Sequence, residues 1–429
     1  MERRHLPLKR QYSYTFTAGI IYSLLLIAWG FSLNPPLEIL AGLRNIIHMQ
    51  DMLITDYCEL SCVGATLVNS GICTIIGLLV VKFSNTPYNG YTIVKIGLLS
   101  GFAMFGKNFI NILPIIFGGW LHARYVKKPF SNYATLTLLT TTLAPLVSYM
   151  GWGFEHASPA LGILTGISIG FVIPALTTYT ATIQHGMNLY NAGFACGLFA
   201  FLFVSVLTVF NFKPETVLIW ATGLNHLFAP ALFLLCTVLI LLGLFGCKVP
   251  VKTVLFEYRR LIATSGRVPC DYLVKFGIAP VLVNIGLTGM IGTAYILLIG
   301  GDLNGPTLGG ILTIMGFAAI GKHPVNIIPI MAGIALGSYL HHTPTHPSLQ
   351  LAALFGTTLA PISGHFGWPY GILAGFLHSA LVLQTGGVTG GVNLYNNGFT
   401  AGLIVIVLYP IISAVRKSHE PKKKKYREE

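Results

Sequence analysis

Long apolar runs separated by short polar stretches make up most of the chain. A helix needs about 20 residues to cross the hydrocarbon core of a bilayer, and several of the runs reach that length. In the first part of the chain they lie near 14–33, 60–82, 92–106, 109–125, 133–150, 160–182, 188–210 and 219–246. Comparable runs follow to residue 414. The pattern predicts an all-α polytopic membrane protein with about fourteen hydrophobic segments.

An internal repeat relates the two halves of the chain. Residues 101–118 and 316–333 are identical at ten of eighteen positions, with an offset of 215. Further along, Thr141–Pro145 matches Thr357–Pro361, and the sequence Asn-Leu-Tyr-Asn-x-Gly-Phe at 188–194 returns at 393–399. Such self-similarity indicates a duplicated structural unit, here with about six hydrophobic segments in each copy.

The repeats divide the chain into five parts, and one extra apolar helix precedes each repeat. We expect a basic cytoplasmic N-terminus, a first membrane helix and an outer loop over 1–55. Repeat 1 then covers 56–212, and a linker helix with a basic cytoplasmic loop covers 213–270. Repeat 2 covers 271–414, and a basic cytoplasmic tail covers 415–429.

Two segments of each repeat are shorter than a full crossing. In repeat 1 they flank Gly106-Lys107-Asn108, and Gly321-Lys322-His323 interrupts the equivalent stretch of repeat 2. Irregular backbone at membrane depth is tolerated where protein or a watery cavity satisfies it. We therefore predict paired short helices in 92–125 and 305–340, either as re-entrant hairpins or as broken spanning helices.

The positions of lysine and arginine predict the orientation. With a cytoplasmic N-terminus and each short pair returning to its own side, 22 of the 26 basic residues, including Lys82 and Lys95, fall in cytoplasmic segments. The loop 124–128 contains three of them, whereas the equivalent loop of repeat 2, 339–346, contains none. This predicts inverted repeats in the plasma membrane (a bacterial inner membrane), with both termini cytoplasmic.

Composition narrows the class of protein. Charged residues make up 9% of the chain and hydrophobic residues 54%, against roughly 25% charged in soluble domains. This excludes a soluble enzyme and a disulfide scaffold. The net charge of +13 follows from the topology, so no nucleic-acid partner is expected. The lipid bilayer is the expected partner, no cofactor or metal is predicted, and formation of a homo-oligomer is left open.

Two resemblances rest on the repeated motifs. The paired Gly-Lys-x3-Asn-x2-Pro and Asn-Leu-Tyr-Asn-x-Gly-Phe sequences resemble a family of duplicated bacterial membrane proteins known as domain of unknown function 1576. That resemblance implies a multi-pass membrane protein and no particular activity. Tyr190-Asn191 and Tyr395-Asn396, each before a glycine-rich apolar helix, are more weakly similar to urea transporters, whose proline-rich signature has no match here.

Lys107 and Lys322 are the sharpest candidate site residues. Each lies between apolar segments at equivalent places in the two repeats, and an ionisable residue within a membrane is a functional hypothesis by default. If helices begin directly after them, free N–H groups would add donors for an anion. The alternative is a structural lysine that reaches the interface or binds loop carbonyls.

Amide, imidazole and phenol groups near the lysines could replace the hydration shell of a polar solute. Asn188 and Asn191 would share one face of a helix at a spacing of three residues. The alternative role is hydrogen bonding between helices. The candidate binding residues, in addition to the two lysines, are Asn108, His323, Asn111, Asn326, Asn188, Tyr190, Asn191, Asn393, Tyr395 and Asn396.

These features favour a transporter or channel-like facilitator for a small polar or anionic solute, with its site between the repeats near the bilayer midplane. The thirteen acidic residues fall in loops, termini or helix edges, so we expect no carboxylate within the membrane as a proton relay or sodium ligand. Two other classes stay open: a membrane enzyme acting on lipid-linked substrates, and a scaffold or sensor that transports nothing.

Overall fold

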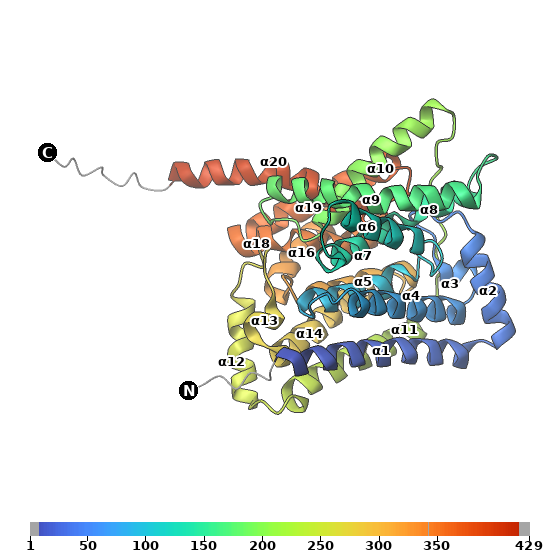
Figure 1. The fold of residues 1–429 in the computed structure, drawn as a ribbon. Helices are drawn as coiled ribbons and strands as arrows, with labels where there is room; N and C mark the ends of the chain where they lie inside the picture. The colour runs from blue at the N-terminus through green and yellow to red at the C-terminus, as the bar shows by residue number, and fades with distance from the viewer. Residues whose placement is uncertain (1–7, 342, 420–429) are drawn as a thin grey trace.

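The fold is taken from a computed structural model that describes residues 8–341 and 343–419 (Figure 1). Basic residues at both chain ends, among them Arg3, Arg4 and the lysines of 422–425, lie outside this range. The described residues are almost entirely helical and contain isolated β-bridges but no strand. The predicted all-α class is therefore confirmed.

Eight helices of the described chain are long and apolar enough to cross a bilayer. They are α1 (Leu8–Leu33), α4 (Val63–Phe83), α9 (Pro159–Ile183), α10 (Asn191–Val209), α11 (Asn225–Leu241) with its π-helical extension Leu242–Gly246, α14 (Ile278–Leu298), α19 (Trp368–Val388) and α20 (Asn396–His419). Many leucine, valine and phenylalanine side chains on their outer faces are exposed, which suits a lipid environment. The chain is a multi-pass membrane protein.

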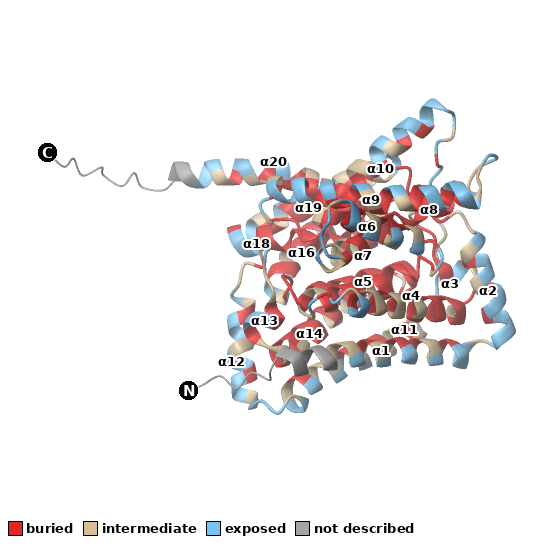
Figure 2. Ribbon diagram, viewed as in Figure 1, coloured by how far each residue is buried: buried red, intermediate tan, exposed pale blue. Residues whose placement is uncertain are grey.

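Four shorter apolar helices accompany the long ones in this part of the chain. They are α5 (Gly90–Phe102), α6 (Leu113–Tyr125), α15 (Gly305–Phe317) and α16 (Pro324–Leu340). A helix of thirteen residues, such as α5, is only about 20 Å long. In Figure 2, α5 is largely buried at the centre, whereas α1 and α12 (Val251–Ile262) present exposed faces at the periphery.

The predicted segment 133–150 is not one helix. It consists of α7 (Ala134–Thr140), a 3₁₀ turn (Thr141–Leu143) and α8 (Ala144–Trp152). Repeat 2 has the same break, with α17 (Pro347–Phe355), the 3₁₀ turn Gly356–Leu359 and α18 (Ala360–Phe366). Pro145 and Pro361 each lie in the first turn of the following helix, where proline has no N–H to continue the preceding helix. A repeated proline therefore explains the repeated break.

Two amphipathic helices occupy segments that were expected to be loops. Helix α2 (Pro36–His48) lies in the outer loop of 1–55, and α12 lies in the basic segment of 213–270. Each has an apolar side that packs inward, through Ile39 and Ile46 of α2 and Leu261 of α12. Short helices α3 (Tyr57–Leu60) and α13 (Tyr272–Phe276) then precede the first long helix of each repeat.

Helices α5 and α15, which are equivalent in the two repeats, pack against each other in opposite directions. A Cβ atom added to Gly90 would lie 2.7 Å from the carbonyl oxygen of Ala319, whereas one added to Gly305 would lie 2.5 Å from that of Met104. As residue numbers rise along α5, the contacted numbers on α15 fall. With the offset of 215, these two contacts are also the same contact made twice, as a two-fold relation requires.

One basic residue lies elsewhere than predicted. Lys95 was assigned to a cytoplasmic segment, but it lies within α5, where only 2% of its side chain is exposed. Its ammonium group donates to Thr135 Oγ1 at 2.9 Å. The short helix begins at Gly90, earlier than expected, and so draws Lys95 into the protein.

Candidate functional site

The two candidate lysines occupy equivalent turns between short helices. Lys107 follows α5 and Lys322 follows α15, and their backbone N–H groups donate to Phe102 and Phe317 at 3.2 and 3.1 Å. Asn69 Nδ2 donates to the carbonyl oxygens of Ala103 and Lys107 at 2.7 and 2.8 Å. Asn284 repeats this with Ala318 and Lys322 at 2.8 and 2.7 Å. The asparagines thus hold both turns against the first long helix of their repeat.

Aromatic rings surround both ammonium groups. Lys107 Nζ lies 5.0 Å from the ring centroid of Phe102, and Lys322 Nζ lies 5.4 Å from that of the equivalent Phe317. Both lysines are fully buried, with 1% and 0% of the residue exposed. The described part of the chain shows no carboxylate paired with either lysine. Ring faces stabilise a cation in such a position without neutralising its charge.

Tyr190 and Tyr395 join the two lysine clusters. Their rings stack with centroids 4.9 Å apart and an interplanar angle of 24°. Tyr190 also contacts Phe317 of the other repeat at 4.6 Å, and Tyr395 contacts Phe102 at 4.9 Å. Each tyrosine therefore lies beside the lysine turn of the opposite repeat. Of the residues predicted from the sequence, the fold gathers these two tyrosines and the two lysines between the repeats. Asn188 and Asn393 also lie there, because their amide groups donate to the carbonyl oxygens of Gly398 and Gly193 in the opposite repeat.

The two clusters differ in their hydrogen bonds. Lys322 Nζ donates to Tyr190 Oη and to Thr357 Oγ1, the latter at 2.7 Å. Within the described chain, the Lys107 ammonium makes no hydrogen bond to protein. The buried hydroxyl group of Tyr395, whose ring contacts Phe102, also has no protein partner there. The lysine of repeat 2 thus makes two hydrogen bonds to protein, whereas the cluster around Lys107 keeps unused donors.

Asn188 and Asn393 support the stacked tyrosines from extended turns. The side chain of Asn188 accepts from Tyr190 N at 2.9 Å, and that of Asn393 accepts from Tyr395 N at 3.1 Å. Helix α10 begins only at Asn191, so Asn188 and Asn191 do not share a helical face, contrary to the prediction. Asn188 and Asn393 each form an Asx turn, and the helix begins only after that turn.

Asn108, Asn111, His323 and Asn326 hold the turns in shape. Asn111 Oδ1 accepts from Asn108 N at 2.9 Å, and Asn326 Oδ1 accepts from His323 N at the same distance. His323 Nε2 lies 3.0 Å from Thr264 O. These hydrogen bonds lie within the turns or reach the loop after α12, and so differ from the bonds between helices that were the alternative to solute binding. These four residues are therefore close to the lysines in the chain, but their side chains are used in hydrogen bonds that shape the turns.

The remaining two asparagines lie at helix starts. Asn191 Nδ2 donates to Thr177 O at 3.1 Å, and its Oδ1 has no partner within the described chain. The Asn396 amide contacts the hydroxyl groups of Thr385 and Thr389 at 2.9 and 3.2 Å. Both side chains pack toward the preceding helix, so the structure does not bring them to the lysines.

A buried carboxylate reaches the turn of repeat 1, which the sequence did not suggest. Asp51 is in a loop, as expected, but its exposed fraction is 0%. It accepts from Tyr57 Oη at 2.6 Å, Ser148 Oγ at 2.7 Å and Asn111 Nδ2 at 3.0 Å. Burial raises the pKa of the Asp51 carboxyl group to about 7, and these three hydrogen bonds oppose that rise. Asp51 therefore anchors the loop before α3 to the lysine turn.

Repeat 2 replaces this carboxylate by close backbone packing. The position equivalent to Asp51 is Gly266, and the position equivalent to Ser148 is Gly364. A Cβ atom on Gly266 would lie 2.0 Å from Gly321 O, and one on Gly364 would lie 2.2 Å from Ser265 O. The two turns are therefore supported by different chemistry, although their backbones match.

Helix starts lie near the lysines only in repeat 2. Helix α16 begins at Pro324, directly after His323, whereas α6 begins at Leu113. In both helices a proline occupies the first turn and lacks an N–H group. Convergence of two free helix N-termini on an anion, as predicted, is therefore not what the turns provide. Within the described residues no group of three His, Cys, Asp or Glu is placed to share a metal ion.

The sequence had signals for some residues that were missed. Asn69 and Asn284 stand in a repeated Leu-Val-Asn sequence, and Thr357 opens the repeated Thr-Thr-Leu-Ala-Pro motif. Asp51 had no such signal because its equivalent is a glycine. Residues that recur in both repeats, such as Asn69 and Asn284, could have been found from the repeat. A contact made in one repeat alone, such as that of Asp51, could not.

Comparison with known proteins gives one match. The family described as protein of unknown function (DUF1576) matches residues 35–209 and 251–414. These regions overlap the two predicted repeats, and each begins about 20 residues before its repeat. No curated protein and no solved structure matches the chain, so the weaker likeness to urea transporters stays a prediction. The two matched regions confirm the duplication and the first resemblance. The chain belongs to the DUF1576 family of membrane proteins, whose function is unknown.

Proposed function

We propose that this protein is a transporter or channel-like facilitator for a small polar or anionic solute, which passes between the two repeats. The observation that carries the proposal is the cluster around Lys107, whose ammonium group makes no hydrogen bond to protein within the described residues. A buried ammonium group without a carboxylate costs free energy in the empty protein. Tyr395, whose ring contacts Phe102 beside Lys107, has no partner for its hydroxyl group in the part of the chain that the structure describes. An anion or a carbonyl-bearing solute would accept hydrogen bonds from such donors.

The arrangement of the repeats supports a path between them. Helices α5 and α15 run antiparallel, so we infer that the repeats have inverted topology in the membrane. Transporters of that type place their binding site at the repeat interface, near interrupted helices. The turns at Lys107 and Lys322 are such interruptions. On this basis we propose that the short helix pairs, α5–α6 and α15–α16, enter the membrane without forming simple spans.

The positions of the helix ends support the proposed orientation. Helix α1 begins and α20 ends on the same side of the molecule, where α12 also lies (Figure 1). Helix α12 contains Lys252, Arg259 and Arg260. Because basic residues gather on the cytoplasmic side, we place this side in the cytoplasm of a cell whose plasma membrane holds the protein.

A ligand screen followed by a flux assay tests the proposal. Full-length protein in detergent is heated with small anions, neutral amides, sugars or amines, and a ligand present at about 100 times its dissociation constant should stabilise it by about 2.7 kcal/mol. The stabilising class is then tested for uptake into proteoliposomes. Lys107→Met and Tyr395→Phe should abolish both effects, whereas Lys127→Met, in an exposed loop, should leave them unchanged.

Other outcomes would favour the other classes. Uptake no faster than into empty liposomes, with no ligand found, would favour a scaffold in which the lysines only join helices. Conversion of a lipid-linked substrate, sensitive to His323→Ala, would favour an enzyme. A ligand whose effect survives both Lys107→Met and Tyr395→Phe would refute the assignment of the site.

A further inference from the structure

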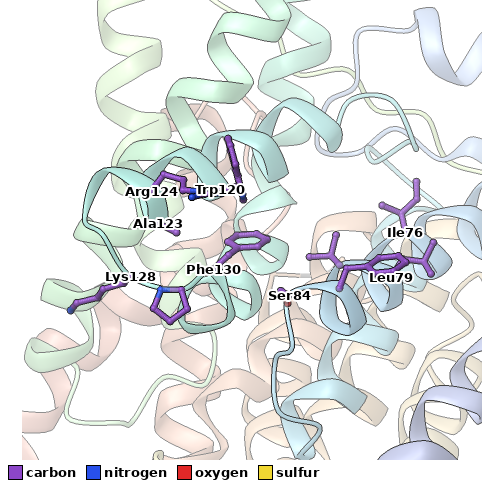
Figure 3. Close-up of a pocket in the computed structure, with 11 residues that line it drawn as sticks. Ile76, Leu79, Ser84, Trp120, Ala123, Arg124, Lys128 and Phe130 are labelled. Atoms are coloured by element: carbon purple, nitrogen blue, oxygen red, sulfur yellow. The ribbon is translucent and has the colours of Figure 1, made fainter.

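A groove on the outside of repeat 1 lies apart from the lysine clusters. It has a volume of about 640 Å³ and runs between α4 and α6 (Figure 3), which is within the ~300–1,000 Å³ typical of small-molecule sites. Ile76, Leu79 and Phe83 of α4 form one wall, and Trp120 of α6 forms the other. Phe83 is 76% exposed, so apolar surface lines an opening toward the membrane.

Positive charge closes one end of this groove. Arg124 and Lys128 line it together with Ser84, and Figure 3 shows the Arg124 side chain beside Trp120. The Arg124 guanidinium lies 5.1 Å from the Trp120 ring centroid, which holds it at the groove. Neither basic group forms an ion pair with an acidic side chain in the described part of the chain. An apolar channel that ends in two unneutralised cations complements an amphiphile with an anionic head.

We propose that this groove binds an anionic phospholipid, with its phosphate on Arg124 and Lys128 and an acyl chain along α4. Basic pockets between membrane helices bind anionic headgroups in this way. A soluble anion would use the two cations but not the exposed apolar wall, whereas a zwitterionic lipid would fit the wall but gain less from the cations. The location on the lipid-facing side favours a lipid over either. This site is independent of the proposed transport path.

Native mass spectrometry of the full-length protein tests the proposal. Delipidated protein is titrated with phosphatidylglycerol or phosphatidylcholine, and we expect preferential binding of one phosphatidylglycerol. The double variant Arg124→Gln/Lys128→Gln should weaken this binding roughly 30-fold, since each basic residue near an anionic headgroup is worth roughly fivefold. The matched control Lys252→Gln/Arg259→Gln removes the same two charges from exposed positions of α12 and should bind as the unaltered protein does.

A second variant separates lipid from free phosphate. Val80→Trp fills the groove from its α4 wall and leaves the cations in place, so it should also weaken phosphatidylglycerol binding. Inorganic phosphate in large excess should fail to displace the lipid. Equal binding of both lipids, full binding by Arg124→Gln/Lys128→Gln, or displacement by phosphate would each overturn the proposal. Retained melting behaviour of the variants in detergent shows that loss of binding is not loss of folding.

Discussion

Tyr190 and Tyr395 stack with ring centroids 4.9 Å apart, yet among the described residues a hydrogen-bond partner exists for the hydroxyl group of Tyr190 and not for that of Tyr395. The stack lies where the two repeats meet. Each tyrosine contacts the phenylalanine beside the lysine turn of the opposite repeat, so the two halves make the same contact. Equivalent side chains thus have equivalent neighbours but different hydrogen bonding. That difference makes the two halves separable by mutation.

Removal of the two hydroxyl groups should have unequal effects. Tyr190→Phe deletes the acceptor of a buried ammonium group, so we expect it to lower the free energy of unfolding by about 1.5–3 kcal/mol. Tyr395→Phe removes a hydroxyl group that has no protein partner within the described residues and should leave stability unchanged or slightly higher. Denaturation in detergent measures both. Equal destabilisation by the two variants would contradict the asymmetry.

The asparagines that hold the lysine turns should be needed for stability in both repeats. Asn69→Ala and Asn284→Ala each leave two buried carbonyl groups without their donor, at a cost of about 2–3 kcal/mol. Asn69→Ala should cost more, because Asn69 Oδ1 also accepts from Phe109 N at 3.3 Å, while Asn284 Oδ1 has no partner in the described chain. The same denaturation experiment measures this order, and a larger loss for Asn284→Ala would refute it.

The arrangement of the chain was largely predictable from its sequence, because hydrophobic runs and the 215-residue offset are properties of the sequence itself. The sequence did not predict where some helices end or where they are interrupted. The run 133–150 contains enough apolar residues for one span, but Pro145 permits a 3₁₀ turn before it. Hydropathy does not register that turn. Helices α2 and α12 were missed because their apolar residues cover one face only.

The candidate site was predictable in its residues but not in its bonding. The two lysines could be predicted because they occupy equivalent positions of the repeat between apolar segments. The two tyrosines could be predicted because they also recur at equivalent positions. Lys322 is the lysine that is hydrogen-bonded to protein, because Thr357 and Tyr190, which are far apart in the sequence, both lie beside it in the fold. The sequence places Asp51 in a loop, where an exposed side chain would be expected. In the fold this loop, between α2 and α3, is buried at Asp51. Contacts between segments far apart in the chain leave no trace in a single sequence.

The Asp51 anchor should be among the most sensitive positions outside the long helices. Asp51→Ala leaves the donors of Tyr57, Ser148 and Asn111 without their acceptor, and we expect a loss of about 3 kcal/mol or more. Asp302→Ala is the matched control, because that carboxylate accepts a single side-chain hydrogen bond, from Trp220 Nε1 at 3.1 Å, and should lose about 1 kcal/mol. Similar unfolding curves for the two variants would show that Asp51 anchors nothing.

The glycine that replaces Asp51 in repeat 2 should tolerate no side chain. Gly266 has φ of 72°, and an added Cβ atom would lie 2.0 Å from Gly321 O, so Gly266→Ala combines backbone strain with a clash. Gly223 has a similar φ of 77° but no atom within 4 Å of such a Cβ. Gly223→Ala should therefore cost about 1 kcal/mol, and Gly266→Ala distinctly more. Equal melting temperatures for the two variants would show that the packing at Gly266 is not close.

Replacement of each lysine by methionine separates stability from function. Lys322→Met removes the donor to Tyr190 and Thr357, whereas Lys107→Met removes no hydrogen bond to any residue of the described chain. Both substitutions relieve the cost of a buried charge, so Lys107→Met should be more stable than Lys322→Met by about 2 kcal/mol or more in the same denaturation experiment. If Lys107 binds the solute, the more stable variant is also the one that no longer responds to it. A Lys107→Met protein less stable than Lys322→Met would instead show that Lys107 is part of the scaffold, because its ammonium group would then be contributing to stability in the empty protein.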